Sequence, residues 1–132
     1  MSAPEKMMVD TDVFIDFLRG YAPAVAFMQN APLPILVSVI TVAELFSGVR
    51  EGNERVRLEQ TLIACTIIQL TVDLAMRGGI FRRDYGKSHG VGLADAMIAA
   101  TADACHCMLV TLNHKHYPML ENIKVPYQKN GN

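Results

Sequence analysis

The sequence predicts an α/β fold with three layers, α/β/α, in which a central, mostly parallel sheet of about five strands is covered by helices on both faces. Short segments that are apolar throughout alternate with segments of helical periodicity, which is typical of such a sheet. Ligands of these folds bind beyond the carboxyl ends of the strands. Unusual polar residues follow three of the predicted strands: Asp10, Asp12, Ser38, Thr111 and Asn113.

Each element is predicted from its local pattern. The predicted strands are the apolar segments 7–9, 35–37, 66–70, 108–112 and 123–125. The predicted helices are 11–20, 22–29, 41–49, 54–64, 72–85 and 93–104. The pair Gly78-Gly79 predicts a kink in the fifth helix, and 86–92 is expected to be a polar, glycine-rich loop. A turn of helix is expected within 114–120.

The composition is that of one globular domain spanning residues 1–132. Hydrophobic residues make up 51% of the chain and charged residues 19%, which is enough for a single core. The beginning of the chain has no signal-peptide pattern, and the uncharged region before Glu44 is interrupted by Pro32 and Pro34, so we expect no membrane segment. Three cysteines are an odd number, which favours reduced thiols and a cytoplasmic location.

The net charge of −1 is unusual for a protein that handles nucleic acid, because binders of polyanions usually carry a basic surplus. The balance changes if some acids bind cations. With three acids taken as metal ligands, ten remain against twelve lysines and arginines. The charge therefore permits RNA as a ligand without arguing for it.

Three carboxylates lie in apolar surroundings. Asp10 directly follows a buried strand, Glu44 has mostly small or hydroxylated helical neighbours, and Asp95 shares its helical face with Ile98 and Ala99. An unpaired buried carboxylate costs several kcal/mol, so each of these acids needs a partner. Ligands that are all oxygen favour Mg²⁺ or Mn²⁺ over zinc.

Each acid also has a simpler interpretation. Either Asp10 or Asp12 could cap the helix that follows the first strand, Asp95 could cap its own helix, and Glu44 could pair with Arg50 or Arg55. Taken singly, these interpretations are about as good as the functional one. However, no lysine or arginine lies within three residues of Asp10 or Asp95. The three acids together therefore favour a shared metal ion.

Two other patterns are weaker. The segment Cys105-His106-Cys107 lacks the second pair of ligands that structural zinc sites need. The residues Arg82, Arg83, Lys87 and His89, with Tyr85 among them, form either an RNA-facing patch or an ordinary solvated surface.

Four segments, taken in order, resemble the PIN-domain ribonucleases, and most closely the VapC-type toxins of bacterial toxin–antitoxin pairs. The segments are 8–16 (MVDTDVFID), 39–48 (VITVAELFSG), 92–102 (GLADAMIAATA) and 109–117 (LVTLNHKHY). The resemblance covers nearly the whole chain. It implies a PIN-like fold and metal-dependent hydrolysis of RNA phosphodiester bonds.

The resemblance also implies roles for individual residues. Asp10, Glu44 and Asp95 are expected to be catalytic and to bind Mg²⁺ or Mn²⁺, with the two aspartates binding most directly. The residues expected to support this centre or orient the substrate are Thr11, Thr111, Asn113 and His116. Many relatives carry a fourth acid at the position of His116, so the number of metal ions, one or two, stays open. His116 is expected to contact a phosphate or a metal-bound water, or to be a partly buried turn residue.

Family resemblance further implies the partners. We expect tRNA or another structured RNA as substrate, a small cognate antitoxin, and a homodimer. The apolar side chains available for a dimer interface on short helices include Phe14, Phe17, Phe46 and Val49.

Two alternatives remain. The first is a phosphatase of the haloacid-dehalogenase type, because Asp10-Thr11-Asp12 after a strand imitates the nucleophile and acid of that family. That family also needs a positioned lysine, a late acidic pair and room for a cap domain, none of which is evident. The second alternative is a non-catalytic, PIN-like binding module.

Overall fold

The sheet of this computed structural model, which describes residues 5–32 and 34–129, has five strands that are all parallel. Their order across the sheet is β3-β2-β1-β4-β5. The strands are β1 (Met7–Val9), β2 (Ile35–Ser38), β3 (Thr66–Ile68), β4 (Met108–Val110) and β5 (Ile123–Lys124). The predicted α/β fold with a mostly parallel sheet of about five strands is confirmed.

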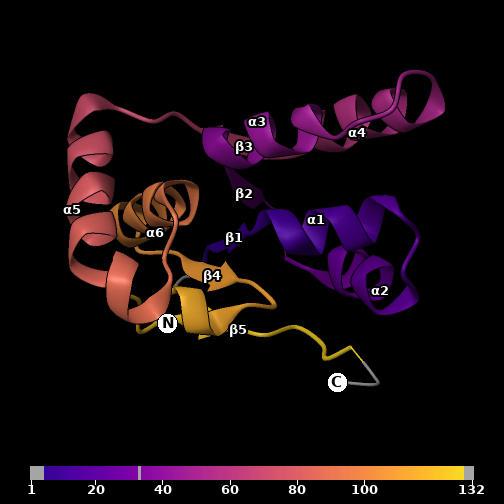
Figure 1. The fold of residues 1–132 in the computed structure, drawn as a ribbon. Helices are drawn as coiled ribbons and strands as arrows, with labels where there is room; N and C mark the ends of the chain where they lie inside the picture. Colours follow the sequence, from indigo (N-terminus) through magenta and orange to yellow (C-terminus); the bar gives the residue numbers. More distant parts are fainter. Residues whose placement is uncertain (1–4, 33, 130–132) are drawn as a thin grey trace.

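Helices cover both sides of the sheet. They are α1 (Thr11–Leu18), α2 (Ala22–Asn30), α3 (Val39–Ser47), α4 (Asn53–Ile63), α5 (Val72–His89) and α6 (Leu93–Cys105), followed by the short 3₁₀ helix η1 (His114–His116). Helices α5 and α6 lie on one side of the strands, and α1 and α2 lie on the opposite side (Figure 1). No helix in the described part of the chain is both long enough and apolar enough to cross a membrane.

The central strand β1 is buried on both faces. Met7 and Val9 point into a core that includes Phe14 of α1, whereas Met8 points into a second core with Ile98 of α6. This alternation is why the strand is apolar at every position. Strands β2 and β4 flank β1, so the segments that follow all three strands begin at one edge of the sheet.

Helix α5 is longer than predicted, and residues 86–89 are helical where a loop was expected. The helix ends at Gly90, whose φ of +66° is the left-handed conformation that glycine adopts readily. It runs without a break through Gly78 and Gly79. A Cβ atom on Gly78 would lie 3.0 Å from the Cα of Met97, so this glycine allows α5 to approach α6 closely.

The apolar residues expected at a dimer interface are placed differently. Phe14 is fully buried, and Phe17, Phe46 and Val49 pack against the core of the same chain, because α1 and α3 turn their apolar faces inward. Phe14 is therefore not available to a second chain, whereas Phe17, Phe46 and Val49 are partly exposed, and their place at a dimer interface stays a prediction. Other large exposed apolar side chains include Val72, Met76 and Ile80 along α5.

Candidate active site

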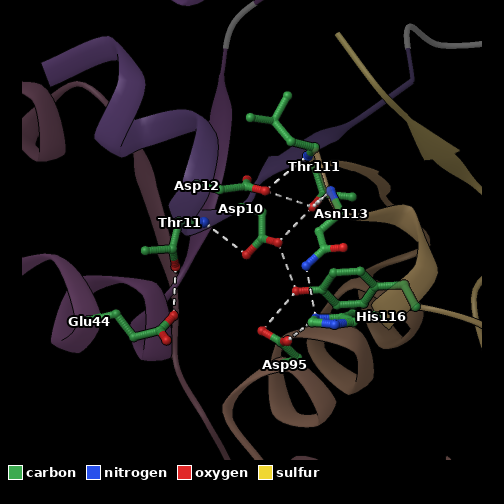
Figure 2. A network of polar contacts seen from close by, with 10 residues as sticks. Asp10, Thr11, Asp12, Glu44, Asp95, Thr111, Asn113 and His116 are labelled. Atoms are coloured by element: carbon green, nitrogen blue, oxygen red, sulfur yellow. Dashed lines mark hydrogen bonds and ion pairs between the residues drawn. The ribbon is translucent and has the colours of Figure 1, made fainter. Parts of the chain in front are cut away.

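Asp10 lies directly after β1 and is the N-cap of α1, with only 5% of its surface exposed. Its Oδ1 accepts a hydrogen bond from the Thr11 backbone N–H at 2.8 Å, so the capping interpretation is correct as far as it goes. Its Oδ2 accepts two more, from the Thr111 hydroxyl at 2.9 Å and the Tyr117 hydroxyl at 2.8 Å. Figure 2 shows the Asp10 carboxylate at the centre of the polar network. Capping accounts for only one of its three bonds.

The environment of Asp10 disfavours its charged form. Burial raises the pKa of this carboxyl to about 7, and the nearby charge of Asp12 acts in the same direction. The hydrogen bonds from Tyr117, Thr11 and Thr111 oppose this rise without cancelling it. Among the residues that the structure describes, no lysine, arginine or histidine forms an ion pair with Asp10. Within the described residues, the carboxylate of Asp10 is therefore stabilised by hydrogen bonds and not by an ion pair.

Asp12 was considered only as a helix cap or phosphatase acid, but it belongs to the same network. Its Oδ1 accepts from the Val13 backbone N–H at 2.8 Å, and its Oδ2 accepts from the Leu112 backbone N–H at 3.0 Å. The Thr111 hydroxyl also lies 3.3 Å from Oδ2. Burial raises the pKa of Asp12. This aspartate ties the start of α1 to the segment after β4.

Asp95 lies in the first turn of α6, but it does not cap that helix. The N-cap is Gly92, and no side chain caps the helix there. Instead, Asp95 Oδ1 lies 3.3 Å from the Tyr117 hydroxyl and Oδ2 lies 3.2 Å from His116 Nδ1. Two acids that are 85 residues apart in sequence, Asp10 and Asp95, thus contact the same hydroxyl group.

His116 and Asn113 flank Asp95. The Asn113 side-chain amide nitrogen lies 2.9 Å from His116 Nδ1, the same ring nitrogen that faces Asp95. One ring nitrogen cannot accept from an amide and donate to a carboxylate in the same tautomer, so the tautomer decides which bond forms. The His116 side chain is 38% exposed, which leaves it open to a ligand.

Glu44, the third predicted acid, is not brought into contact with Asp10 or Asp95. Its Oε1 accepts a hydrogen bond from the Thr11 hydroxyl at 2.7 Å, and this hydroxyl also lies 3.1 Å from Thr41 Oγ1. Figure 2 shows Glu44 set apart from the two aspartates, beyond Thr11. The alternative pairing with Arg50 or Arg55 is not formed in the described residues, since the ion pairs of Arg55 are with Glu51 and Glu59.

Glu44 also lines a groove of about 520 Å³ between α1, α3 and α4. Both charged and apolar side chains line this groove, among them Arg19, Arg57, Ile15 and Leu58. The groove adjoins the polar network through Glu44 alone, since neither Asp10 nor Asp95 lines it.

The donors at Asp10 and Asp95 suit a hard cation. Within residues 5–32 and 34–129, no three His, Cys, Asp or Glu side chains are gathered closely enough to hold a metal by themselves. Magnesium does not need such a cage, because it is commonly bound through one or two carboxylates and keeps several of its waters. Two carboxylates that meet at one hydroxyl, with no lysine or arginine paired to either in the described part of the chain, fit this pattern.

Zinc fits poorly at the Cys105-His106-Cys107 segment. All three cysteines of the chain are free thiols, and Cys107 is buried. Burial and the neighbouring Cys105 raise the pKa of Cys107 to about 12, whereas zinc binds the thiolate.

In the predicted basic patch on α5, Arg83 forms an ion pair with Asp84 at 2.9 Å. The negative charge of Asp84 partly offsets the attraction that Arg83 would exert on an RNA ligand.

Tyr117 was not predicted as a site residue, although it was quoted within the last motif. It is 1% exposed, and its hydroxyl is the group that Asp10 and Asp95 share. A tyrosine that closes a motif rich in polar residues was the available signal. Its apolar ring made it indistinguishable from a core residue by pattern alone.

Comparisons with known proteins agree with this arrangement. The family model described as "PIN domain" matches residues 7–119. Ribonuclease VapC10 of Mycobacterium tuberculosis is 38% identical over 128 residues, which cover 95% of this chain and 96% of the relative. Ribonuclease VapC19 of the same organism is 36% identical, with 91% and 98% covered.

A solved toxin–antitoxin complex from Klebsiella pneumoniae contains a chain of the same fold. It superposes with a TM-score of 0.82 at 27% sequence identity and covers 94% of this chain and 100% of that chain. The sequence match to the family extends over both aspartates, over Glu44 and over Thr111. The chain therefore belongs to the PIN-domain family and, within it, to the VapC ribonucleases.

Proposed function

We propose that this protein is a Mg²⁺- or Mn²⁺-dependent endoribonuclease and the toxin of a toxin–antitoxin pair. The observation that carries the proposal is the pairing of Asp10 and Asp95 at one hydroxyl, with no lysine or arginine bound to either among the described residues. Two aspartates in this arrangement are ready for a cation from solution. The names of the relatives, both ribonucleases, supply the reaction.

A bound divalent cation lowers the pKa of a coordinated water and stabilises charge on the oxygens of the scissile phosphate. Asp10 and Asp95 would hold this cation, and Glu44 would complete the site from the far side of Thr11. Thr11 and Thr111 orient the carboxylates by the hydrogen bonds they already donate.

The exposed edge of the site would receive the RNA. His116, with Asn113 beside it, is the most open polar side chain that contacts Asp95. His116 would contact a phosphate of the substrate. Its tautomer would be set by whether Nδ1 bonds to Asn113 or to Asp95. Substrate choice among structured RNAs, tRNA included, would depend on this edge.

The direct test is cleavage of a labelled structured RNA by purified protein. We expect cleavage with Mg²⁺ or Mn²⁺ and none with EDTA. Asp95→Asn should abolish cleavage, whereas Asp103→Asn should not. Asp103 is the matched control because it lies on the same helix, where it pairs with Arg77 at 2.7 Å.

Two outcomes would contradict the proposal. Turnover of a phosphomonoester without RNA cleavage would support the haloacid-dehalogenase-type alternative that uses Asp10 and Asp12. Absence of both activities, together with RNA binding that is unchanged in Asp95→Asn, would support a non-catalytic binding module.

We further propose a small cognate antitoxin and a homodimeric toxin. The Klebsiella pneumoniae structure is described as a toxin–antitoxin complex, which supports such a partner for this chain. Co-expression with the product of the adjacent reading frame should give a stable complex with reduced cleavage. Light scattering that reports a monomer at tens of micromolar would contradict the dimer.

A further inference from the structure

The position of the Tyr117 hydroxyl is fixed by the core. The ring is 1% exposed and belongs to the apolar cluster under α6, together with Met8, Ile98 and Leu109. Tyr117 also ends the η1 turn, where its backbone N–H donates to the His114 carbonyl at 3.0 Å. A ring packed in this way cannot change rotamer without disrupting the core, so the position of its hydroxyl is fixed.

From that place, the hydroxyl contacts both aspartates. It donates to Asp10 Oδ2 at 2.8 Å and lies 3.3 Å from Asp95 Oδ1. A phenol has a single proton, so the shorter contact takes most of the bond. Burial, with the charges of Asp10 and Asp95, raises the pKa of Tyr117, which keeps the phenol a neutral donor.

The bond from Tyr117 also determines which part of Asp10 stays open. A carboxylate offers about four acceptor positions, two on each oxygen. On Asp10, Oδ2 is filled by Tyr117 and Thr111, and one position of Oδ1 is filled by the Thr11 N–H. The remaining acceptor position is on Oδ1. The three donors hold the carboxylate in one orientation and leave one lone pair for a ligand.

We propose that Tyr117 is a positioning residue of the cation site: its hydroxyl orients the Asp10 carboxylate and holds Asp95 beside it, so that both are in place before a divalent cation arrives. This inference rests on the proposed function, since it assumes that the two aspartates bind a cation. Partners of this kind behind a metal ligand typically contribute about 10–100-fold to metal affinity or activity.

The test is Mn²⁺ binding without RNA, measured from the electron paramagnetic resonance signal of free Mn²⁺, in the wild type, Tyr117→Phe and Tyr127→Phe. Tyr127 is a matched control because its hydroxyl also donates to a buried carboxylate at 2.8 Å, that of Asp16. We expect Tyr117→Phe to raise the Kd for Mn²⁺ by about 10–100-fold. Tyr127→Phe should leave it unchanged. A purely structural role would lower the melting temperature in both variants and the affinity in neither.

The outcomes separate the two proposals. Wild-type protein that binds no Mn²⁺ would overturn the proposed function and this inference with it. Wild-type binding that Tyr117→Phe leaves equal or makes tighter would overturn the inference alone, because the hydroxyl would then be neutral toward the cation or in competition with it.

A second measurement needs no folded Tyr117 variant. The chain has four tyrosines and no tryptophan, so its near-ultraviolet absorption reports mainly on tyrosine. A divalent cation bound beside the Tyr117 hydroxyl should change the electrostatic environment of that phenol and give a saturable difference spectrum, in the wild type and in Tyr127→Phe alike. A flat spectrum at saturating Mn²⁺ would contradict the proposal.

Discussion

Two buried aspartates near the same helix have similar surroundings and different partners. Asp10 is 5% exposed and Asp16 is 6% exposed, and each accepts a hydrogen bond from a tyrosine hydroxyl at 2.8 Å. Asp16 also accepts from Lys129 Nζ at 2.8 Å, whereas Asp10 has no cation among the described residues. The difference separates Asp16, a buried carboxylate paired with a lysine, from Asp10, the proposed cation ligand.

The surroundings of Asp16 show how a buried acid is satisfied within one chain. Tyr127 and Lys129 come from the segment after β5, and Tyr21 lies against both of them: its ring is 5.5 Å from that of Tyr127 and 5.6 Å from the ammonium group of Lys129. These contacts fasten the end of the described chain onto α1. Asp10 has hydroxyl and backbone donors of comparable quality, but its negative charge is not balanced.

The largest expected effect is on the pH dependence of stability in EDTA. Burial raises the pKa of Asp10 to about 7, from the ordinary value of 3.8 for an aspartate in water. Between these values the folded state binds more protons, so its stability falls as the pH rises, by about 4 kcal/mol at most from this group. Asp10→Asn should therefore gain stability over the wild type as the pH rises from 4 to 7, in denaturant titrations. A stability difference between Asp10→Asn and the wild type that does not change with pH would contradict the assignment.

The next effect is on cleavage. Asparagine caps a helix about as well as aspartate, so Asp10→Asn tests the charge and spares the cap. Outer partners of metal ligands are worth about 10–100-fold, so loss of the ligand itself should lower the rate by at least about 100-fold. Asp16→Asn, measured below its melting temperature, should cleave at nearly the wild-type rate. Equal losses in the two variants would mean that the effect is on folding.

The difference between Asp10 and Asp16 is not visible in the sequence. Both aspartates stand among apolar residues, and the lysine that pairs with Asp16 is 113 residues away. Asp10, Glu44 and Asp95 could be grouped because each stands in apolar surroundings where a carboxylate needs a partner. The structure brings Asp10 and Asp95 to one hydroxyl and places Glu44 one hydrogen bond further away, behind Thr11.

The fold was more accessible than the site. Strands buried on both faces and amphipathic helices leave strong periodic patterns, and these gave the elements to within a few residues. The loop predicted at 86–89 was wrong because glycine and polar residues favour a loop locally, whereas the packing of α5 against α6 stabilises the helix through His89. The role of Tyr117 depends on where a buried ring places one oxygen atom, which no local pattern encodes.

A smaller effect is expected at Glu44. Among the described residues, its carboxylate accepts a hydrogen bond from the Thr11 hydroxyl alone (Figure 2), and a glutamine oxygen can accept the same bond. Glu44→Gln should therefore preserve the fold and lower the affinity for Mn²⁺ less than Asp10→Asn does, with cleavage reduced by roughly tenfold, the lower end expected for a group that supports a metal site. Cleavage kinetics over a range of Mn²⁺ concentrations would measure both. A loss as large as that of Asp10→Asn would show that Glu44 binds the cation directly.

The smallest effect is expected at Lys129, and it tests the comparison of Asp10 with Asp16 at Asp16 itself. Lys129→Met removes the cation of Asp16 while keeping a long apolar stem beside Tyr21. The Lys129 side chain is 47% exposed, so water screens the pair, and the loss should be about 1 kcal/mol or less of unfolding free energy. Cleavage and Mn²⁺ affinity should be unchanged, because the side chain of Asp16 bonds to Tyr127 and Lys129 and, within the described residues, to neither Asp95 nor Tyr117. The control is Lys115→Met, because Lys115 lies next to the site and forms no ion pair among the described residues. Denaturant titration of both variants would separate loss of the Asp16 pair from a general loss of positive charge. If Lys129→Met weakened Mn²⁺ binding as well, the two aspartates would not be independent, and the division into a structural and a functional carboxylate would fail.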